Sequence, residues 1–225
     1  MSAINILIQS NSVHILTDGT VFHPDGKLIM IGPKAVCLPH LNCAIAFRGA
    51  AGAKMMLSEV IAFGAPTFDG LRQTIPELLK SQAEQFSEAF QLCTSGPEFE
   101  VVVAGISETA GPTAYIVNSH GRYGKSWTPI ELAGFVPLPC DEVTLSKMQR
   151  IIPPGTSPDD IDPDRDGLAV MKIQRATPRL SNGDFCPVGA FAQLTSVTRN
   201  SVSTRIIHRW PDVIGEEIGS TSVAA

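Results

Sequence analysis

The sequence lacks the segments that direct a chain into or across a membrane. No apolar run reaches the roughly 18 residues that a membrane-spanning helix needs. The first residues also lack the basic stretch followed by an apolar stretch that marks a signal peptide. We therefore expect a cytoplasmic protein with no membrane partner.

Motifs for binding nucleic acids and nucleotides are missing as well. The formal net charge is −5 and Lys and Arg form no cluster, which disfavours a nucleic-acid partner. Neither a P-loop nor a G-x-G-x-x-G segment occurs, and we expect no cofactor. The five cysteines are odd in number and scattered, which favours reduced thiols over a disulfide framework: Cys37, Cys43, Cys93, Cys140 and Cys186.

What the sequence does have is an ordinary globular composition. It contains 225 residues, of which 44% are hydrophobic and 17% charged, enough to form one domain with a full core. We expect that single domain to cover residues 1–218. The last residues, 219–225, are small and polar and are expected to form a disordered tail.

The order of apolar segments and turn residues predicts an α+β protein with mostly antiparallel sheets and helices layered around them. The expected strands are 4–9, 12–17, 27–31, 34–38, 41–47, 100–106, 113–118, 122–127, 190–198 and 203–210. The expected helices are 54–63, opened by the glycines at 49 and 52, then 69–92, 141–151 and 166–176.

Three residues near the start of the chain are equally spaced. Ser2, Asp18 and Lys34 are separated by 18 − 2 = 16 and 34 − 18 = 16 residues. Removal of Met1 would expose the hydroxyl and the α-amine of Ser2 together. An α-amine has a pKa of about 7.7–8.0 and can act as a base at neutral pH. Such a residue could therefore attack an amide carbonyl and accept its own hydroxyl proton.

The segments around these residues resemble a known family. SVHILTDG, then GPKAV, then AIAFRGAAG look like the signature of N-terminal-nucleophile hydrolases of the proteasome β-subunit group, including its HslV-like bacterial two-ring members. The resemblance is clearest over Ser2–Val60 and continues only as an order of elements beyond it. It implies a four-layer αββα sandwich and a homo-oligomeric ring.

The resemblance also implies roles for individual residues. Ser2 falls on the nucleophile position, where the family has Thr, and Asp18 and Lys34 fall on its acidic and lysine positions. The backbone N–H of Gly49, at the head of a helix, would bind the oxyanion. Because Gly49 requires one inserted residue relative to the family pattern, Arg48 is the alternative occupant of that position.

Two parts of the family pattern have no clear counterpart. A Ser–Gly pair is expected where this chain reads AGFVPLP, over residues 133–139. The acidic–serine pair expected after the fourth helix finds only Asp184 and Ser181, whose order and spacing do not match. These departures lower the expectation of an active site.

Two other patterns resemble metal sites, and the sequence argues against both. The acidic run over residues 162–167 begins like a calcium loop, but its twelfth position is Ile173 where a bidentate Glu is needed. Cys37, His40 and Cys43 lack a fourth ligand for zinc. We expect no metal.

The sequence thus leaves two functions open. The first is an amide- or peptide-bond hydrolase acting on a peptide or small amide through Ser2. The alternative is a catalytically inactive, proteasome-like structural or assembly subunit, for instance of a particle, which keeps the fold without the chemistry.

Overall fold

Two five-stranded sheets dominate the chain in a computed structural model that describes residues 3–93 and 96–219. The first has the order β10-β1-β2-β11-β12 and the second the order β5-β6-β7-β8-β9, while β3 and β4 form a separate pair. Every paired strand in the described residues is antiparallel.

The strands of the first sheet are β1 (Ile4–Ile8), β2 (Ser12–Asp18), β10 (Phe135–Leu138), β11 (Phe191–Thr198) and β12 (Ser201–Arg209). Those of the second are β5 (Ala35–Leu38), β6 (Cys43–Gly49), β7 (Phe99–Ser107), β8 (Gly111–Asn118) and β9 (Ile130–Leu132). The separate pair is β3 (Thr20–Phe22) and β4 (Leu28–Ile31). The first sheet therefore combines both ends of the chain.

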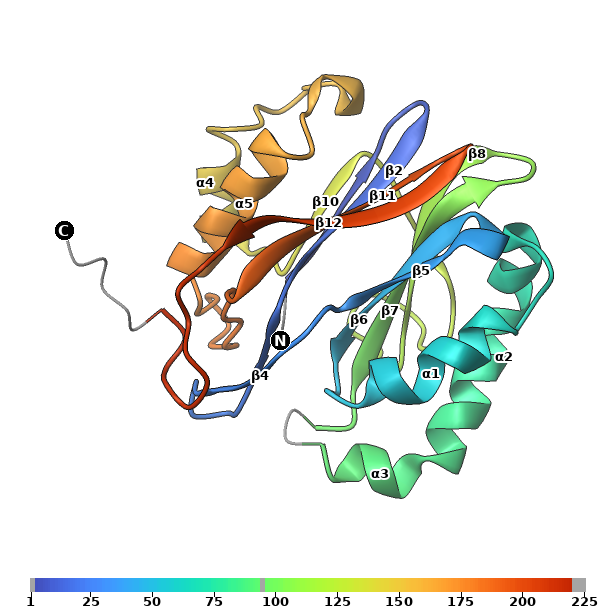
Figure 1. Cartoon of the computed structure of the whole chain (residues 1–225), viewed down its shortest axis with the longest axis horizontal. Helices are drawn as coiled ribbons and strands as arrows, with labels where there is room; N and C mark the ends of the chain where they lie inside the picture. The colour runs from blue at the N-terminus through green and yellow to red at the C-terminus, as the bar shows by residue number, and fades with distance from the viewer. Residues whose placement is uncertain (1–2, 94–95, 220–225) are drawn as a thin grey trace.

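The helices are α1 (Ala53–Ala62), α2 (Phe68–Gln85), α3 (Ser87–Gln91), α4 (Glu142–Met148) and α5 (Arg165–Ala176), with short 3₁₀ turns at Pro39–Leu41 and Pro158–Asp160. Figure 1 shows α1 and α2 beside the sheet that holds β5, β6 and β7, and α4 and α5 beside the other sheet. Apolar residues at helical spacing explain α2, since Leu71, Ile75 and Leu79 are all buried.

Three clusters of buried apolar side chains join these layers. Leu57 and Leu71 lie in the cluster between the helices and the second sheet. Ile15 and Val102 belong to the cluster between the two sheets, and Met171 packs α5 against the first sheet. In β6, alternate residues enter different clusters, as the two faces of a strand require.

The α+β class and the antiparallel sheets are confirmed, whereas the strict four-layer sandwich stays a prediction, because the β3–β4 pair belongs to neither large sheet. The domain and tail boundaries also stay predictions. Within the described residues, none of the helices has both the length and the hydropathy that a membrane span requires.

Some expected elements differ from the structure. The strand expected over 122–127 is wrong: that stretch consists of turns, and β9 follows it instead. The long helix expected over 69–92 is divided at Phe86, whose backbone leaves helical geometry between α2 and α3. Of the glycines expected to open the first helix, Gly49 ends β6 and Gly52 lies in a turn, so that α1 begins only at Ala53.

The packing of α2 on the second sheet generates a stability prediction. Phe68 is fully buried and its ring lies 5.9 Å from that of Tyr115. We expect Phe68→Ala to lower the free energy of unfolding by about 3–5 kcal/mol through the cavity it leaves. Urea denaturation would measure this, with Phe63→Ala as the control, because Phe63 is 86% exposed. Equal effects of the two changes would contradict the packing.

Candidate functional site

A buried ion pair joins two of the residues singled out by the sequence. Asp18 ends β2 and is fully buried, and Lys34 lies between β4 and β5 with 8% of its surface exposed. Lys34 Nζ donates to Asp18 Oδ1. The structure thus brings together two side chains that are separated by a whole hairpin.

Asp18 accepts three further hydrogen bonds in the described residues, one from the residue just before β1 and two from Thr20. The backbone N–H of Ala3 donates to Oδ1 at 3.0 Å. Thr20 donates twice to Oδ2, through its hydroxyl and, at 3.0 Å, through its backbone N–H. The carboxylate therefore has four donors, which is what a buried charge requires.

The backbone explains why Lys34 returns to Asp18. Gly19 follows Asp18, and the hairpin of β3 and β4 leads back so that Gly32 N donates to Gly19 O at 3.0 Å. Lys34 is two residues further on, and its carbonyl accepts from Phe47 N at 3.2 Å. The separation of Asp18 and Lys34 in the sequence thus corresponds to the β3–β4 hairpin, whose ends meet at Gly19 and Gly32.

Burial controls the protonation of Lys34. Desolvation lowers the pKa of the Lys34 amine, and the nearby positive charge of Arg48 lowers it further. The charge and hydrogen bond of Asp18 act in the opposite direction but do not outweigh the burial. Lys34 is therefore more easily deprotonated than a lysine in water.

The third predicted residue, Ser2, lies outside the described residues, as does Met1. Ala3 is fully buried and donates to Asp18. The N-terminal strand thus leads the chain into the site.

Gly49 does not lie at the start of a helix, where the sequence predicted it. It is the last residue of β6 rather than the head of a helix, because α1 begins only at Ala53. Its φ is +95°, and a Cβ there would lie 2.2 Å from the Glu98 carbonyl, so only glycine fits. Gly49 lines the same cavity as Lys34, and its role as oxyanion donor stays a prediction.

Arg48 belongs to a buried polar cluster that sequence reasoning missed. Its Nη1 lies 3.1 Å from Glu100 Oε2, and His120 Nε2 lies 3.0 Å from Glu100 Oε1. Because His120 Nδ1 accepts from Arg122 N, the neutral imidazole carries its proton on Nε2. An arginine in the otherwise apolar strand AIAF was the one sequence signal for this cluster.

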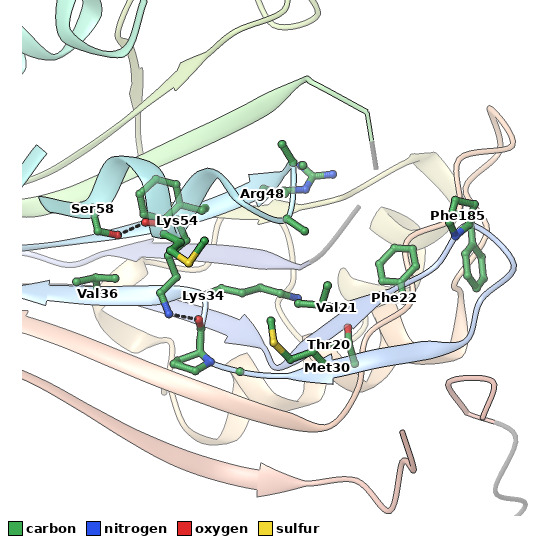
Figure 2. A pocket seen from close by; sticks show the side chains of 18 of the residues that line it. Thr20, Val21, Phe22, Met30, Lys34, Val36, Arg48, Lys54, Ser58 and Phe185 are labelled. Atoms are coloured by element: carbon green, nitrogen blue, oxygen red, sulfur yellow. Dashed lines mark hydrogen bonds between the residues drawn. The ribbon is translucent and has the colours of Figure 1, made fainter. Parts of the chain in front are cut away.

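A cavity of about 800 Å³ opens beside the Asp18–Lys34 pair. Figure 2 shows side chains of Lys34, Arg48 and Lys54 in its lining, with the apolar side chains of Val21 and Met30. Most of its other large lining residues are apolar: Phe22, Val36, Phe47, Met55 and Phe185. The cavity can hold an apolar group next to a lysine and a glycine backbone.

The weak matches to the family pattern lie elsewhere. Ser181 N donates to Asp141 Oδ2 at 2.7 Å, and Asp184 is bonded to Asn182, so neither Ser181 nor Asp184 joins the Asp18–Lys34 pair. The AGFVPLP segment forms β10 and pairs with β1, with Leu138 opposite Ile4. That segment therefore supports the N-terminal strand through its backbone.

The patterns that resemble metal sites have other contacts. Asp162 Oδ1 accepts from the backbone of Asp164 and Arg165 at the start of α5. His40 Nε2 lies 2.8 Å from the Ala62 carbonyl. Among the described residues, no group of three or more His, Cys, Asp or Glu could hold a metal ion.

Comparisons with known proteins relate the chain to others by fold. No family model matches the sequence, and no curated protein matches it. Two similar solved structures are "Anbu (ancestral beta-subunit) from Yersinia bercovieri" and an "Anbu (Gly-1) mutant from Hyphomicrobium sp. strain MC1". They are 10% and 11% identical, with TM-scores of 0.65 and 0.66. The alignments cover 92% of this chain and 87% and 88% of theirs.

These comparisons correct the family assignment. Placing the chain with the N-terminal-nucleophile hydrolases of the proteasome β-subunit and HslV-like group is wrong, because the matching structures are Anbu proteins. The physical reason is that the segments that carried the resemblance form strands and a hairpin. Such segments specify a local geometry and do not distinguish one protein family from another. At these identities the likeness shows the fold alone.

The buried cluster beside the site generates a prediction about pH. Burial acts to raise the pKa of Glu100, but its bond to His120 and the charge of Arg48 outweigh it and lower the pKa below the ordinary 4.5. The ionised Glu100 therefore stabilises the fold above about pH 4.5, and this contribution is lost as the pH falls through the lowered value.

We expect Glu100→Gln to lower the free energy of unfolding by about 3–5 kcal/mol at pH 7, because Arg48 is left buried without its counter-charge. The variant should also lose part of the dependence on pH below about 4.5. Urea unfolding at several pH values measures both effects. An unchanged pH profile would contradict the role given to Glu100.

Proposed function

We propose that the chain is an amide- or peptide-bond hydrolase whose nucleophile is the Ser2 hydroxyl, exposed together with its α-amine when Met1 is removed. The observation that carries this proposal is the 3.0 Å bond from Ala3 N to Asp18 Oδ1. It holds the residue that follows Ser2 against the carboxylate that pairs with Lys34.

We propose the following reaction. The Ser2 hydroxyl oxygen bonds to the carbonyl carbon of the substrate amide while the α-amine takes the hydroxyl proton. The C–N bond then breaks, the leaving nitrogen takes that proton, and an ester remains on Ser2. Water, deprotonated by the same amine, cleaves the ester and restores the free hydroxyl.

The neighbouring residues have separate roles in this proposal. The positive charge of Lys34 favours the developing negative charge on the Ser2 oxygen, and Asp18 holds Lys34 in place. Gly49 is proposed to donate its backbone N–H to the oxyanion. Its place in the cavity lining beside Lys34 supports that role.

The shape of the cavity supports a substrate class. An apolar space of about 800 Å³ is of the size that binds small molecules or a side chain of a peptide. We propose that the substrate is a peptide or small amide with a large apolar group on the acyl side of the cleaved bond.

The fold gives further support. It is shared with two proteins named as Anbu, one of them as an ancestral beta-subunit, which fits a proteasome-related peptidase. The helices on the outer face of each sheet also fit the αββα sandwich. We propose a cytoplasmic homo-oligomeric ring, since Met55, Phe63 and Leu92 are large apolar residues left exposed.

One observation favours the alternative, an inactive structural subunit. Asp184 and Ser181, the only matches to the second acidic–serine pair, bond to other residues instead of the Asp18–Lys34 pair. An inactive chain would keep the fold and the buried ion pair as structural features. Chemical labelling separates the two functions.

The direct test begins with the intact mass of the purified protein, which shows whether Met1 is present. We expect Met1 to be absent and a fluorophosphonate probe to attach to Ser2 at a rate that rises with pH up to about 8. Ser2→Ala should abolish labelling and Ser2→Thr should retain it. Retention of Met1 in every molecule, or equal labelling of Ser2→Ala, would reject the mechanism.

A second prediction tests the cavity with a matched pair of variants. Met30 lines the cavity and is 53% exposed, while Ile29, on the same strand, is 46% exposed and lies outside the lining. We expect Met30→Glu to raise the KM for an amide with a large apolar acyl group by roughly tenfold. Ile29→Glu should leave the KM unchanged, and equal effects would exclude the cavity as the substrate site.

A further inference from the structure

The chain beyond β12 returns toward the site and contacts two of the elements that surround it. We call residues 211–219 the C-terminal segment. Asp212 near its start is bonded to α5 and to the loop before β11, and residues 215–218 pair with the hairpin of β3 and β4. The segment therefore connects parts of the chain that are far apart in sequence.

Asp212 is a fully bonded buried carboxylate. Its side chain is 1% exposed and accepts from Arg175 Nη1 and Nη2 at 2.8 and 2.7 Å. It also accepts from the backbone of Ala190 at 2.7 Å and of Gly219 at 3.2 Å. Burial acts to raise the pKa of Asp212, but these bonds outweigh it and the pKa is lowered.

Arg175, the main partner of Asp212, makes further contacts of its own. Its Nη1 donates to the Val188 carbonyl at 2.7 Å, and its guanidinium lies 5.2 Å from the centre of the Trp210 ring. A Cβ at Gly189 would lie 2.4 Å from Asp212 Oδ2 and 2.6 Å from Arg175 Nη1. The loop at residues 188–190 is thus held closely against the Arg175–Asp212 pair.

Backbone bonds lead from that loop to the Asp18–Lys34 pair. The Gly189 carbonyl accepts from Gly19 N at 3.1 Å, one residue after Asp18. The Gly19 carbonyl accepts in turn from Gly32 N at 3.0 Å, two residues before Lys34. Asp18 itself pairs with Ala192 across the sheet.

The other end of the C-terminal segment holds the wall of the cavity. Leu28 donates to Glu216 at 2.9 Å and accepts from Gly215 at 2.8 Å. Ile218 N donates to the Gly26 carbonyl at 3.2 Å. The same hairpin contributes Val21, Phe22 and Met30 to the cavity lining. One segment thus supports both the wall of the cavity and the backbone beside Asp18.

We propose that Asp212 is a positioning residue of the site, which, paired with Arg175, fixes the Gly189–Gly19–Gly32 backbone that holds Asp18 and Lys34, and fixes the β3–β4 wall of the cavity. Its effect on the reaction rests on the proposed function, whereas its effect on the backbone does not. If Asp212 only held residues 211–219 in place, its substitution would leave the hydrogen exchange of the Gly19 and Leu28 amides unchanged.

The first arm of the test needs no activity. Hydrogen–deuterium exchange would compare the wild type with Asp212→Asn and with Asp160→Asn, an exposed control that removes the same charge. We expect Asp212→Asn to speed exchange roughly tenfold in peptides covering 19–32 and 188–192 and to leave 99–107 of β7 unchanged. Exchange that rises only in 210–219, or evenly through β7, would overturn the proposal.

The second arm measures labelling of Ser2 by the fluorophosphonate probe as a function of pH. We expect Asp212→Asn to slow labelling roughly tenfold and to shift the pH midpoint, because the Lys34 environment changes. A wild type that does not label rejects the proposed function and leaves the exchange arm to decide the role of Asp212. A labelling wild type with an identical rate and pH profile in Asp212→Asn overturns the inference.

Arg175→Lys serves as a second variant, so that the proposal can still be tested if Asp212→Asn does not fold. Lysine keeps the positive charge but loses the two parallel bonds to Asp212. We expect Arg175→Lys to change the exchange and labelling rates in the same peptides and the same direction as Asp212→Asn, but by a smaller factor. Wild-type behaviour of Arg175→Lys in both arms would show that the paired geometry is not needed and would overturn the proposal.

Discussion

Two opposite charges, on Asp18 and Lys34, are buried together, and the surrounding structure is arranged to satisfy them. Removing such ions from water costs several kcal/mol each, and only good geometry with additional hydrogen bonds offsets that cost. Asp18 obtains those bonds from Ala3, Thr20 and Lys34. The N-terminal strand, the start of the β3–β4 hairpin and the entry to β5 must therefore meet at one point.

The sequence predicted this part of the site because its determinants are local. The turn and strand residues between Asp18 and Lys34 specify one hairpin, and its closure follows from short-range geometry. The last two expected strands, 190–198 and 203–210, were predicted for the same reason, and the structure confirms them as β11 and β12, which pair with each other. Where residues close together in the sequence determine the conformation, the pattern of apolar and turn residues was sufficient to predict the strands.

Features that depend on distant partners could not be predicted. Glu100 meets Arg48 across β6 and β7, and His120 reaches Glu100 from the turn after β8. Nothing near these residues in the sequence indicates that they are paired. The expected strand over 122–127 failed because its glycine and serine residues favour turns. The family assignment failed because the segments that carried the resemblance specify a local strand and hairpin geometry, which does not by itself identify a family.

The position of β2 between β1 and β11 has a consequence for synthesis in the cell. A ribosome produces β1, β2 and Lys34 early, but the strand that pairs with Asp18 and the loop that supports Gly19 come from residues 189–198, much later. An unfinished chain therefore lacks one side of its own site. If the protein cuts amides, its fold keeps that activity from developing while the nascent chain and its neighbours are still unfolded.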